Sequence, residues 1–424
     1  MSALPRPSGT GPHRTRPPAG IVHLLPGALA VLLATAARAQ EAAPRGQRDP
    51  VRLGVDVLER TGFEAVRNRR LGLITNHTGR NSLGERTVEV LRRAPGATLV
   101  ALFSPEHGLQ GRVDAVVQDG VDEATGLPVY SLYADKDRKP KPHQLKGIDT
   151  LVFDIQDIGT RFYTYISTMG LAMEAAAEAR LRFVVLDRPN PIGGVKVEGP
   201  LADADKGSFV AYHTIPIRHG MTVGELARMF QRERQLRLDL TVVPLQNWDR
   251  SHHLDQAGVE WVHPSPNMRS LRAAILYPGI GVLEMTNLSV GRGTQTPFEL
   301  VGAPWIEARR LAQELRHHSL PGVAIEPVWF KPTYSRFAGQ ECQGVRFVIL
   351  DRERLEPVRL GLHVACALRK LYPEAWKMER LMTLLAAQEV HESIADGRTA
   401  DTILASYRRE LDEFQRRRSS YLMY

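Results

Sequence analysis

Leu71-Gly-Leu-Ile-Thr75 ends abruptly in the polar cluster Asn76-His-Thr-Gly79, and three more apolar runs in the first half of the chain end in the same way. They occupy residues 98–103, 150–153 and 183–186. Continuous apolar runs of this length, separated by helix-like stretches, are typical of parallel strands that are buried on both faces. The sequence therefore predicts an α/β fold built on a doubly wound, mostly parallel sheet.

Helical patterns fill the gaps between these predicted strands. They cover residues 55–66, 86–93 and 165–180, and Thr222-Val-Gly-Glu225 is a capping box that opens a further helix. A fifth strand is expected at 240–243. This alternation of strand and helix is what a doubly wound sheet requires.

The α/β domain is expected to span residues 51–265, and a smaller α+β domain is expected to span residues 266–424. Between 261 and 305 the periodicity is lost and Gly, Pro, Ser, Thr and Asn are frequent, which predicts a functional loop system. The second domain should then contain a helix at 306–316, strands near 323–325 and 345–350, a helix with one apolar face from Leu360 to Leu371, and a last helix over 403–414.

The first 39 residues have the three-part layout of a secretory signal. Four basic residues precede an apolar stretch from Ile21 to Ala37, and small residues flank Arg38, so we expect cleavage after Ala39 and a polar linker over 40–50. The protein should accordingly be secreted or periplasmic. Stable membrane insertion is not expected, because the apolar run is short and no second one follows.

Composition narrows the classes of function. The 424 residues are 43% hydrophobic and 24% charged, with a net charge of +8 to which the first 39 residues contribute four arginines and no acidic residue. Basic residues cluster at 136–146 and 416–418, but such runs are usually solvated, and no interleaved aromatic residues indicate a nucleic-acid partner. Cys342 and Cys366 form neither a disulfide framework nor a metal site, and a bridge between them is disfavoured.

Glu106 is the first candidate for catalysis, because it directly follows a predicted strand. Ligands of open α/β sheets bind outside the carboxyl ends of such strands. A carboxyl group that is partly shielded from water there can act as a general acid, although Glu106 could instead cap the following turn. His107, Asn76 and His77 lie at the same predicted edge of the sheet and are candidate substrate-binding residues.

Asp154, Gln156 and Asp157 follow the next strand. In an Asp-x-x-Asp sequence one carboxylate normally holds backbone amides of the loop, which leaves the other for a substrate hydroxyl or a metal ion. A metal site would need more oxygen ligands than the sequence guarantees, so we predict neither a metal ion nor a cofactor.

Arg161, Tyr163 and Tyr165 come shortly after this motif. A guanidinium suits an anionic substrate group, and tyrosine rings suit the face of a sugar. Arg161 could equally pair with one of the two aspartates upstream.

Arg188 and Asn190 lie in the proline-rich turn that begins at Asp187, and such turns are often purely structural, which is the favoured role for Asp187. The loop region beyond residue 261 offers further candidates. They are Asn267, Glu284, Asn287 and Arg292. Glu284 is a second candidate carboxylate, and the glycines on either side of Arg292 would permit close approach of an anion.

Several catalytic motifs are missing from the sequence. It contains no Gly-x-Ser-x-Gly elbow, no Walker loop and no His-Glu-x-x-His motif, which argues against serine hydrolases, P-loop NTPases and zinc proteases. Carboxylates combined with neutral amides, tyrosines and arginines favour carbohydrate chemistry, because glycosidases commonly use one acid and a second carboxylate.

Blocks of sequence throughout the chain resemble the exo-β-N-acetylmuramidase family of the NamZ type, long catalogued as a domain of unknown function. The blocks are Ile74–Gly79, Phe103–Gly108, Thr125–Tyr133, Phe153–Asp157, Arg161–Ile166, Leu186–Gly194, His219–Thr222, Pro264–Asn267, Thr286–Thr294 and the closing Tyr421–Tyr424. Each block alone is weak, but together they are highly specific. One departure is the segment 134–139, where the family pattern is shorter and contains glycine.

The resemblance implies a hydrolase of cell-wall turnover that releases N-acetylmuramic acid (MurNAc) from the non-reducing end of β-1,4-linked MurNAc–GlcNAc peptidoglycan fragments. It implies a Rossmann-like domain joined to a smaller domain, with the site in the cleft between them. It also transfers Glu106 as the candidate catalytic acid but does not assign the partner of Glu106. From the residues themselves, the second carboxylate is expected to be Asp154, Asp157 or Glu284, and Glu284 is favoured because it should approach the sugar from the opposite side of the cleft.

Two other classes of function fit parts of the sequence. A periplasmic binding protein could capture muropeptides without cleaving them, and an esterase or amidase could act on the same polymer. The missing nucleophile motif disfavours the second class, and the position of Glu106 at a strand end favours catalysis over binding alone.

Overall fold

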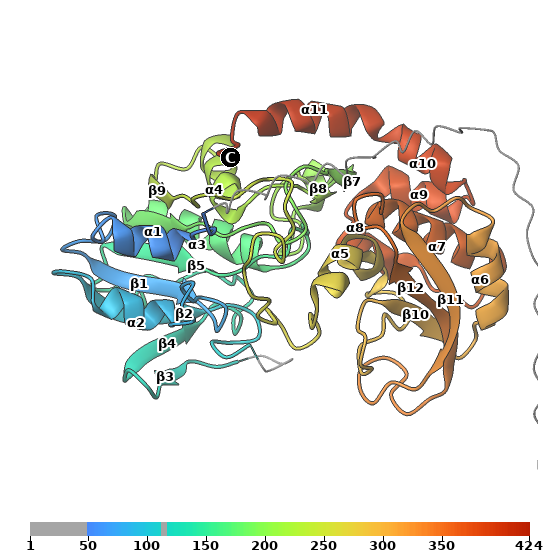
Figure 1. Ribbon diagram of the computed structural model, residues 1–424, viewed down its shortest axis with the longest axis horizontal. Coiled ribbons are helices and arrows are strands. Elements are labelled where there is room, and N and C mark those ends of the chain that lie inside the picture. The colour runs from blue at the N-terminus through green and yellow to red at the C-terminus, as the bar shows by residue number, and fades with distance from the viewer. Residues whose placement is uncertain (1–48, 112–116) are drawn as a thin grey trace, which may run out of the picture. The chain divides into compact units, whose positions relative to one another are not determined.

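A computed structural model describes residues 49–111 and 117–424 of the chain. The predicted signal peptide and most of the predicted linker lie outside the described residues. The described residues, 49–111 and 117–424, belong to one compact unit (Figure 1). The boundary near residue 265 stays a prediction.

A seven-stranded sheet forms the first part of the fold, in the order β3-β4-β2-β1-β5-β6-β9. Its strands are β1 (Arg70–Thr75), β2 (Thr98–Ser104), β3 (Gly120–Asp122), β4 (Leu127–Ser131), β5 (Thr150–Asp154), β6 (Arg182–Leu186) and β9 (Asp239–Val243). Neighbouring strands are parallel except β3 and β4, which are antiparallel. The five predicted strands and the Rossmann-like, mostly parallel sheet are therefore confirmed. Strand order reverses between β1 and β5, where ligands of such sheets bind.

Helices cover both faces of this sheet (Figure 1). They are α1 (Gly54–Arg60), α2 (Thr87–Arg92), α3 (Tyr165–Ala179) and α4 (Val223–Glu233). Two separate cores result, because successive side chains of a strand point to opposite faces. Leu73 and Val152 pack with α1 and α2, whereas Ile74 and Phe153 pack with α3 and α4.

The capping box predicted at Thr222 is confirmed. The Thr222 hydroxyl accepts a hydrogen bond from the Glu225 amide, and the Glu225 carboxylate accepts one from the Thr222 amide. The first helix is shorter than predicted. It ends at Arg60 because Gly62 and Phe63 adopt left-handed backbone angles, with φ of 64° and 62°, which a helix cannot continue through.

The second part of the fold is α+β, as predicted. Its antiparallel sheet has the order β10-β12-β11, whereas a separate two-stranded sheet, formed by β7 and β8, comes from the chain before residue 265. The strands are β7 (Glu198–Leu201), β8 (Pro216–Arg218), β10 (Leu300–Ala303), β11 (Val323–Phe330) and β12 (Cys342–Ile349). The helices are α5 (Leu271–Ile280), α6 (Ala308–Arg316), α7 (Pro357–Leu371), α8 (Met382–Leu385), α9 (Gln388–Ala395), α10 (Ala400–Ser406) and α11 (Arg408–Ser419). Short 3₁₀ turns lie at Ala204–Lys206, Gly281–Leu283 and Glu379–Leu381.

Two predictions for this part were wrong. The segment 261–305 contains α5 and β10 rather than loops alone. Residues 273–280 of α5 are all buried, so the helix has no polar face and its sequence shows no helical periodicity. The last predicted helix is two helices, because the chain leaves the helical conformation at Tyr407.

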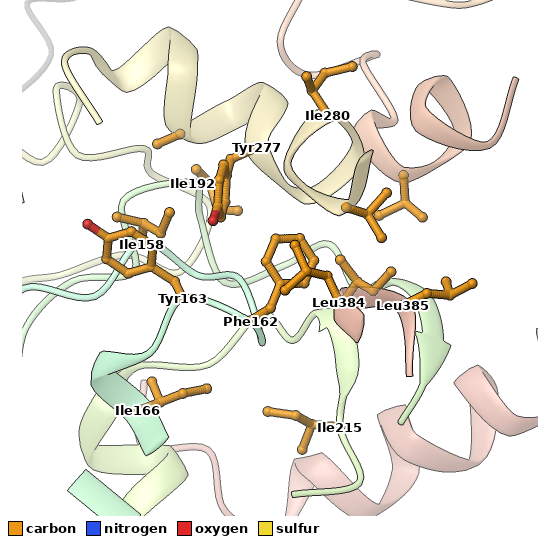
Figure 2. Packing of buried hydrophobic residues seen from close by; sticks show 14 of the residues in the cluster. Ile158, Phe162, Tyr163, Ile166, Ile192, Ile215, Tyr277, Ile280, Leu384 and Leu385 are labelled. Atoms are coloured by element: carbon orange, nitrogen blue, oxygen red, sulfur yellow. The ribbon is translucent and has the colours of Figure 1, made fainter. Parts of the chain in front are cut away.

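One hydrophobic core runs from the large sheet into the C-terminal part. Figure 2 shows Phe162 and Tyr163, which precede α3, beside Tyr277 of α5 and Leu384 of α8. The centroids of the Phe162 and Tyr277 rings are 5.2 Å apart. This contact holds α5 against the loops that leave the carboxyl ends of the strands.

Two further features concern the described residues. Cys342 and Cys366 are free thiols. Within residues 49–111 and 117–424, no helix is both long enough and apolar enough to cross a membrane.

Candidate active site

A cavity of about 290 Å³ is bounded by both parts of the fold. This volume is near the lower end of the range for small-molecule sites, which is about 300–1,000 Å³. Seven of the predicted site residues line it, namely Glu106, His107, Tyr163, Tyr165, Asn267, Glu284 and Arg292. The tertiary structure thus brings together residues that are up to 186 positions apart in the sequence.

Glu106 leaves the end of β2 and its carboxylate is held by one hydroxyl. Glu106 Oε2 accepts a hydrogen bond of 2.6 Å from Thr164 Oγ1. Thr164 occupies the N-cap position of α3, but its side chain makes no capping hydrogen bond, so its hydroxyl is available for the carboxylate. His107 has a φ of 70°, a costly angle for a residue other than glycine and one that is concentrated at functional sites.

Glu284 approaches the same cavity from the C-terminal part, just after the 3₁₀ turn Gly281–Leu283. Its Oε1 accepts a hydrogen bond of 2.6 Å from Arg292 Nη1. A guanidinium at this distance stabilises a negatively charged carboxylate. Arg292 therefore has a carboxylate partner within the protein.

The glycines that flank Arg292 are required by the backbone conformation of the turn. Gly291 and Gly293 both have a φ of 84°, and a Cβ on Gly293 would lie 2.4 Å from the carbonyl oxygen of Tyr334. Only glycine fits these positions. The Gly-Arg-Gly sequence is thus explained by the turn that carries Arg292.

Aromatic side chains form one wall of the cavity. Tyr277 lies near both carboxylates: burial, followed by the charges of Glu284 and Glu106, raises the pKa of its phenol well above the ordinary value. Burial likewise raises the pKa of Tyr163. The Tyr163 ring meets those of Tyr165 and Tyr277 edge-on, at centroid distances of 5.0 Å and 5.9 Å. These phenols stay neutral at ordinary pH.

The chain before α5 closes another side of the cavity. Tyr165 donates a hydrogen bond of 2.5 Å to the carbonyl oxygen of Pro264. Asn267 lines the cavity and accepts a hydrogen bond of 2.7 Å from the Tyr334 hydroxyl. The loop is therefore fixed from both parts of the fold.

Asp154 and Arg188 were predicted to bind substrate, but they bind each other. Arg188 Nε and Nη2 donate to the two carboxylate oxygens of Asp154 at 2.5 Å and 2.9 Å. Thr87 also donates to Asp154. Asp154 is fully buried and Arg188 is 4% exposed, so this pair holds the loops together and does not line the cavity.

Asp157, Gln156 and Asn190 are likewise buried within the loops. Asp157 Oδ2 accepts a hydrogen bond from the Gly159 amide at 2.7 Å, the loop-holding role that Asp-x-x-Asp sequences predict for one carboxylate. Gln156 donates to the carbonyl oxygens of Asp157 and Pro189. Asn190 donates to Met221 at 3.0 Å. None of the three borders the 290 Å³ cavity.

The prediction for Arg161 was wrong. Its side chain is fully buried and donates to four backbone carbonyl oxygens, those of Pro200, Ile215, Leu384 and Leu385. Burial lowers the pKa of this guanidinium to about 9. Arg161 thus ties α8 to the β7–β8 sheet and cannot reach a substrate.

Asn76, His77 and Asn287 also lie outside the cavity wall. Asn76 Oδ1 accepts a hydrogen bond from the Thr78 amide at 2.9 Å. His77 Nε2 lies 2.6 Å from the carbonyl oxygen of His263. Asn287 bonds to the backbone of Ala375 and Lys377 in the C-terminal part. Each fixes a loop near the site.

Sequence reasoning missed four cavity residues that matter for the geometry. They are Tyr133, Arg138, Thr164 and Tyr277. Thr164 sits inside the Arg-Phe-Tyr-Thr-Tyr run, so its neighbours could have drawn attention to it. Arg138 belongs to a basic run that we interpreted as solvated, and Tyr277 lies in the helix that showed no periodicity.

No group of three or more His, Cys, Asp or Glu side chains that could hold a metal ion occurs within the described parts of the chain. The three carboxylates that were candidates for the site, Asp154, Asp157 and Glu284, are engaged separately. Asp154 pairs with Arg188, Asp157 holds a backbone amide, and Glu284 pairs with Arg292.

Comparison with known proteins covers nearly all of the described chain. The family description "Exo-beta-N-acetylmuramidase NamZ, N-terminal" matches residues 71–272, and its C-terminal counterpart matches residues 275–424. The chain is 43% identical over 385 residues to peptidoglycan beta-N-acetylmuramidase NamZ of Bacillus subtilis (strain 168), covering 89% of this chain and 92% of that protein.

Two crystal structures of DUF1343 family proteins from Bacteroides fragilis share the fold. Their TM-scores are 0.82 and 0.70, at 40% and 31% sequence identity. Each comparison covers 88% of this chain and 99% of the other. Together with the sequence matches, they show that this chain belongs to the exo-β-N-acetylmuramidase NamZ family.

Proposed function

We propose that this protein is a glycosidase that releases MurNAc from the non-reducing end of β-1,4-linked MurNAc–GlcNAc fragments of peptidoglycan. The observation that carries the proposal is the presence of two carboxylates, Glu106 and Glu284, in one aromatic-walled cavity. Glycosidases use such a pair on either side of the scissile bond. Family membership supports the same reaction.

Glu106 is the general acid in this proposal. It delivers a proton to the glycosidic oxygen, and Thr164 keeps its carboxyl group in position through the 2.6 Å hydrogen bond. General acid–base groups typically contribute about 10²–10⁴-fold to the rate.

Glu284 is the second carboxylate. Its contact with Arg292 favours the charged form, which suits stabilisation of the positive charge that develops on the sugar or activation of water. The tyrosine and phenylalanine rings exclude water and offer apolar faces to the sugar.

Hydrolysis of 4-nitrophenyl β-MurNAc and of the MurNAc–GlcNAc disaccharide tests the proposal. The purified protein should release nitrophenol and free MurNAc, with the GlcNAc glycoside as the comparison substrate. Tight binding of the disaccharide without turnover would contradict the proposal and favour the non-catalytic binding protein.

We also propose that the protein acts outside the cytoplasm. The basic, apolar and small-residue segments of residues 1–39 support this location. N-terminal sequencing of protein recovered from the periplasm or the medium should give a chain that begins at Gln40. Recovery of an unprocessed chain from the cytoplasm would contradict it.

A further inference from the structure

Arg138 lies on the wall of the cavity, in the connection between β4 and β5. Its guanidinium carbon is 4.5 Å from the centroid of the Tyr133 ring and 4.1 Å from that of Phe209. The two rings also contact each other, at a centroid distance of 6.0 Å. The aromatic contacts therefore hold the guanidinium in place through its faces.

The edge of this guanidinium has no protein acceptor among the residues that the structure describes. Within the described residues, Arg138 Nε is buried without a hydrogen-bond partner. Arg161 Nε and Arg292 Nε are also buried without a partner, but the two terminal nitrogens of Arg161 donate to four carbonyl oxygens. Arg292, the other arginine of the cavity, donates to Glu284.

The charges that line the cavity also favour an anionic ligand at Arg138. In the productive state Glu106 carries the proton that it delivers, and the charges of Glu284 and Arg292 offset each other. Among the carboxylates and guanidinia that line the cavity, the positive charge of Arg138 then remains. A substrate with one negative charge would balance it.

We propose that Arg138, held on the rings of Tyr133 and Phe209, binds the lactyl carboxylate of MurNAc and so distinguishes MurNAc from GlcNAc. Stacking uses the faces of a guanidinium and leaves its N–H edge for a bidentate contact with a carboxylate. The assignment rests on the proposed function. Arg161 and Arg292, the two arginines that the sequence suggested for an anionic group, donate instead to carbonyl oxygens and to Glu284.

The test varies the residue and the substrate together. Arg138→Ala should lower kcat/KM for 4-nitrophenyl β-MurNAc by about 10- to 100-fold, mainly through KM, because it removes hydrogen bonds to a charged group. On the methyl ester of the same substrate, which lacks the negative charge, the variant should lie within about threefold of wild type. Arg138→Lys keeps the charge but loses the planar fork, so its loss on the charged substrate should be intermediate.

Arg310→Ala is the matched control. Arg310 also packs over a tyrosine ring, that of Tyr372 at 5.8 Å, but it lies on α6 and does not line the cavity. Its removal should leave both substrates unaffected. Equal losses of Arg138→Ala on the charged and esterified substrates, or no loss on either, would overturn the assignment.

Calorimetric binding of free MurNAc and GlcNAc separates this inference from the proposed function. Wild type should prefer MurNAc, and Arg138→Ala should lose that preference whether or not the muramide is hydrolysed. If thermal unfolding shows that the alanine variant does not fold, Arg138→Lys provides the test. Its loss of kcat/KM should then be larger on the charged substrate than on the methyl ester. A wild-type protein that hydrolyses muramides but shows no effect of position 138 would contradict only the Arg138 assignment.

Discussion

Two groups of polar side chains lie at the carboxyl ends of the same sheet, and their surroundings differ. Asp154 and Arg188, beyond β5 and β6, form a buried pair with little exposure to solvent. Glu106, beyond β2, opens onto a cavity whose far side is supplied by Glu284. Both groups lie at strand ends. They differ because other segments of the fold bury Asp154 and Arg188, whereas Glu106 borders a cavity.

The difference teaches how a strand-end carboxylate acquires its role. A carboxylate with every oxygen engaged by protein donors is already satisfied, as Asp154 is by Arg188 and Thr87. Glu106 accepts a hydrogen bond from the Thr164 hydroxyl through one oxygen and borders the cavity. We therefore expect changes to the first group to act on stability and changes to the second to act on turnover.

The largest expected effect is on catalysis. Glu106→Gln should lower kcat for a muramide by about 10²–10⁴-fold, because the amide keeps the size of the side chain but has no proton to deliver. Thermal unfolding should remain close to that of wild type. Glu64→Gln, a change at an exposed carboxylate, serves as the control. A loss below tenfold would remove Glu106 from the role of general acid.

Breaking the buried pair should act on stability. Asp154→Ala leaves Arg188 buried without its partner, and removal of one member of such a pair costs about 3–5 kcal/mol of unfolding free energy. Urea unfolding measures this change. The double variant Asp154→Leu with Arg188→Met should be less destabilised than the single variant, since no buried charge is left alone. If Asp154→Ala is as stable as wild type, the buried Asp154–Arg188 pair does not stabilise the fold, and the proposed difference between this pair and the cavity carboxylates is wrong.

A smaller, pH-dependent effect is expected at Asp187. Burial raises the pKa of this carboxyl group from 3.8 to about 6. The folded state therefore binds its proton more tightly than the unfolded state. Its contribution to stability is fully present below about pH 3.8 and is lost as the pH rises through about 6.

Tyr424→Phe tests this carboxyl group. The Tyr424 hydroxyl donates to Asp187 Oδ2 at 2.7 Å and supports its charged form. The variant should lose about 1.5–3 kcal/mol at pH 8, as expected for a hydrogen bond to a charged group, and less at pH 5. Urea unfolding at both values measures it, with Tyr372→Phe as the control. A loss that is larger at pH 5 would contradict the assigned direction.

The smallest expected effect is that of chelation. Asp154, Asp157 and Glu284 each have a separate protein partner, so we expect EDTA to leave muramide hydrolysis within about twofold of the untreated rate, since this chemistry needs only an acid and a second carboxylate. The rate before and after dialysis against EDTA measures it. If EDTA abolishes the activity and added Mg²⁺ or Ca²⁺ restores it, these carboxylates bind a metal ion and the prediction is wrong.

Much of the sheet and part of the site could be predicted from the sequence. Apolar runs that end in polar clusters are a local pattern, so they located five strands, and the capping box located the start of α4. The same pattern placed Glu106 at the edge of the sheet. Helix α5 could not be found in this way, because a helix that is buried on all sides carries no amphipathic period.

The sequence by itself determined which polar residues stand at the ends of the strands, because strand and helix periods are properties of neighbouring residues. Only the tertiary structure decided which of them meet a substrate. Arg161, which lies in one of the family's sequence blocks, is covered by Leu384 and Leu385, more than 200 residues away, and its terminal nitrogen donates to their carbonyl oxygens. Arg138, in a basic run without a recognisable motif, lines the cavity and packs against the ring of Phe209. Burial and hydrogen-bond partners depend on contacts between distant segments, which no local pattern records.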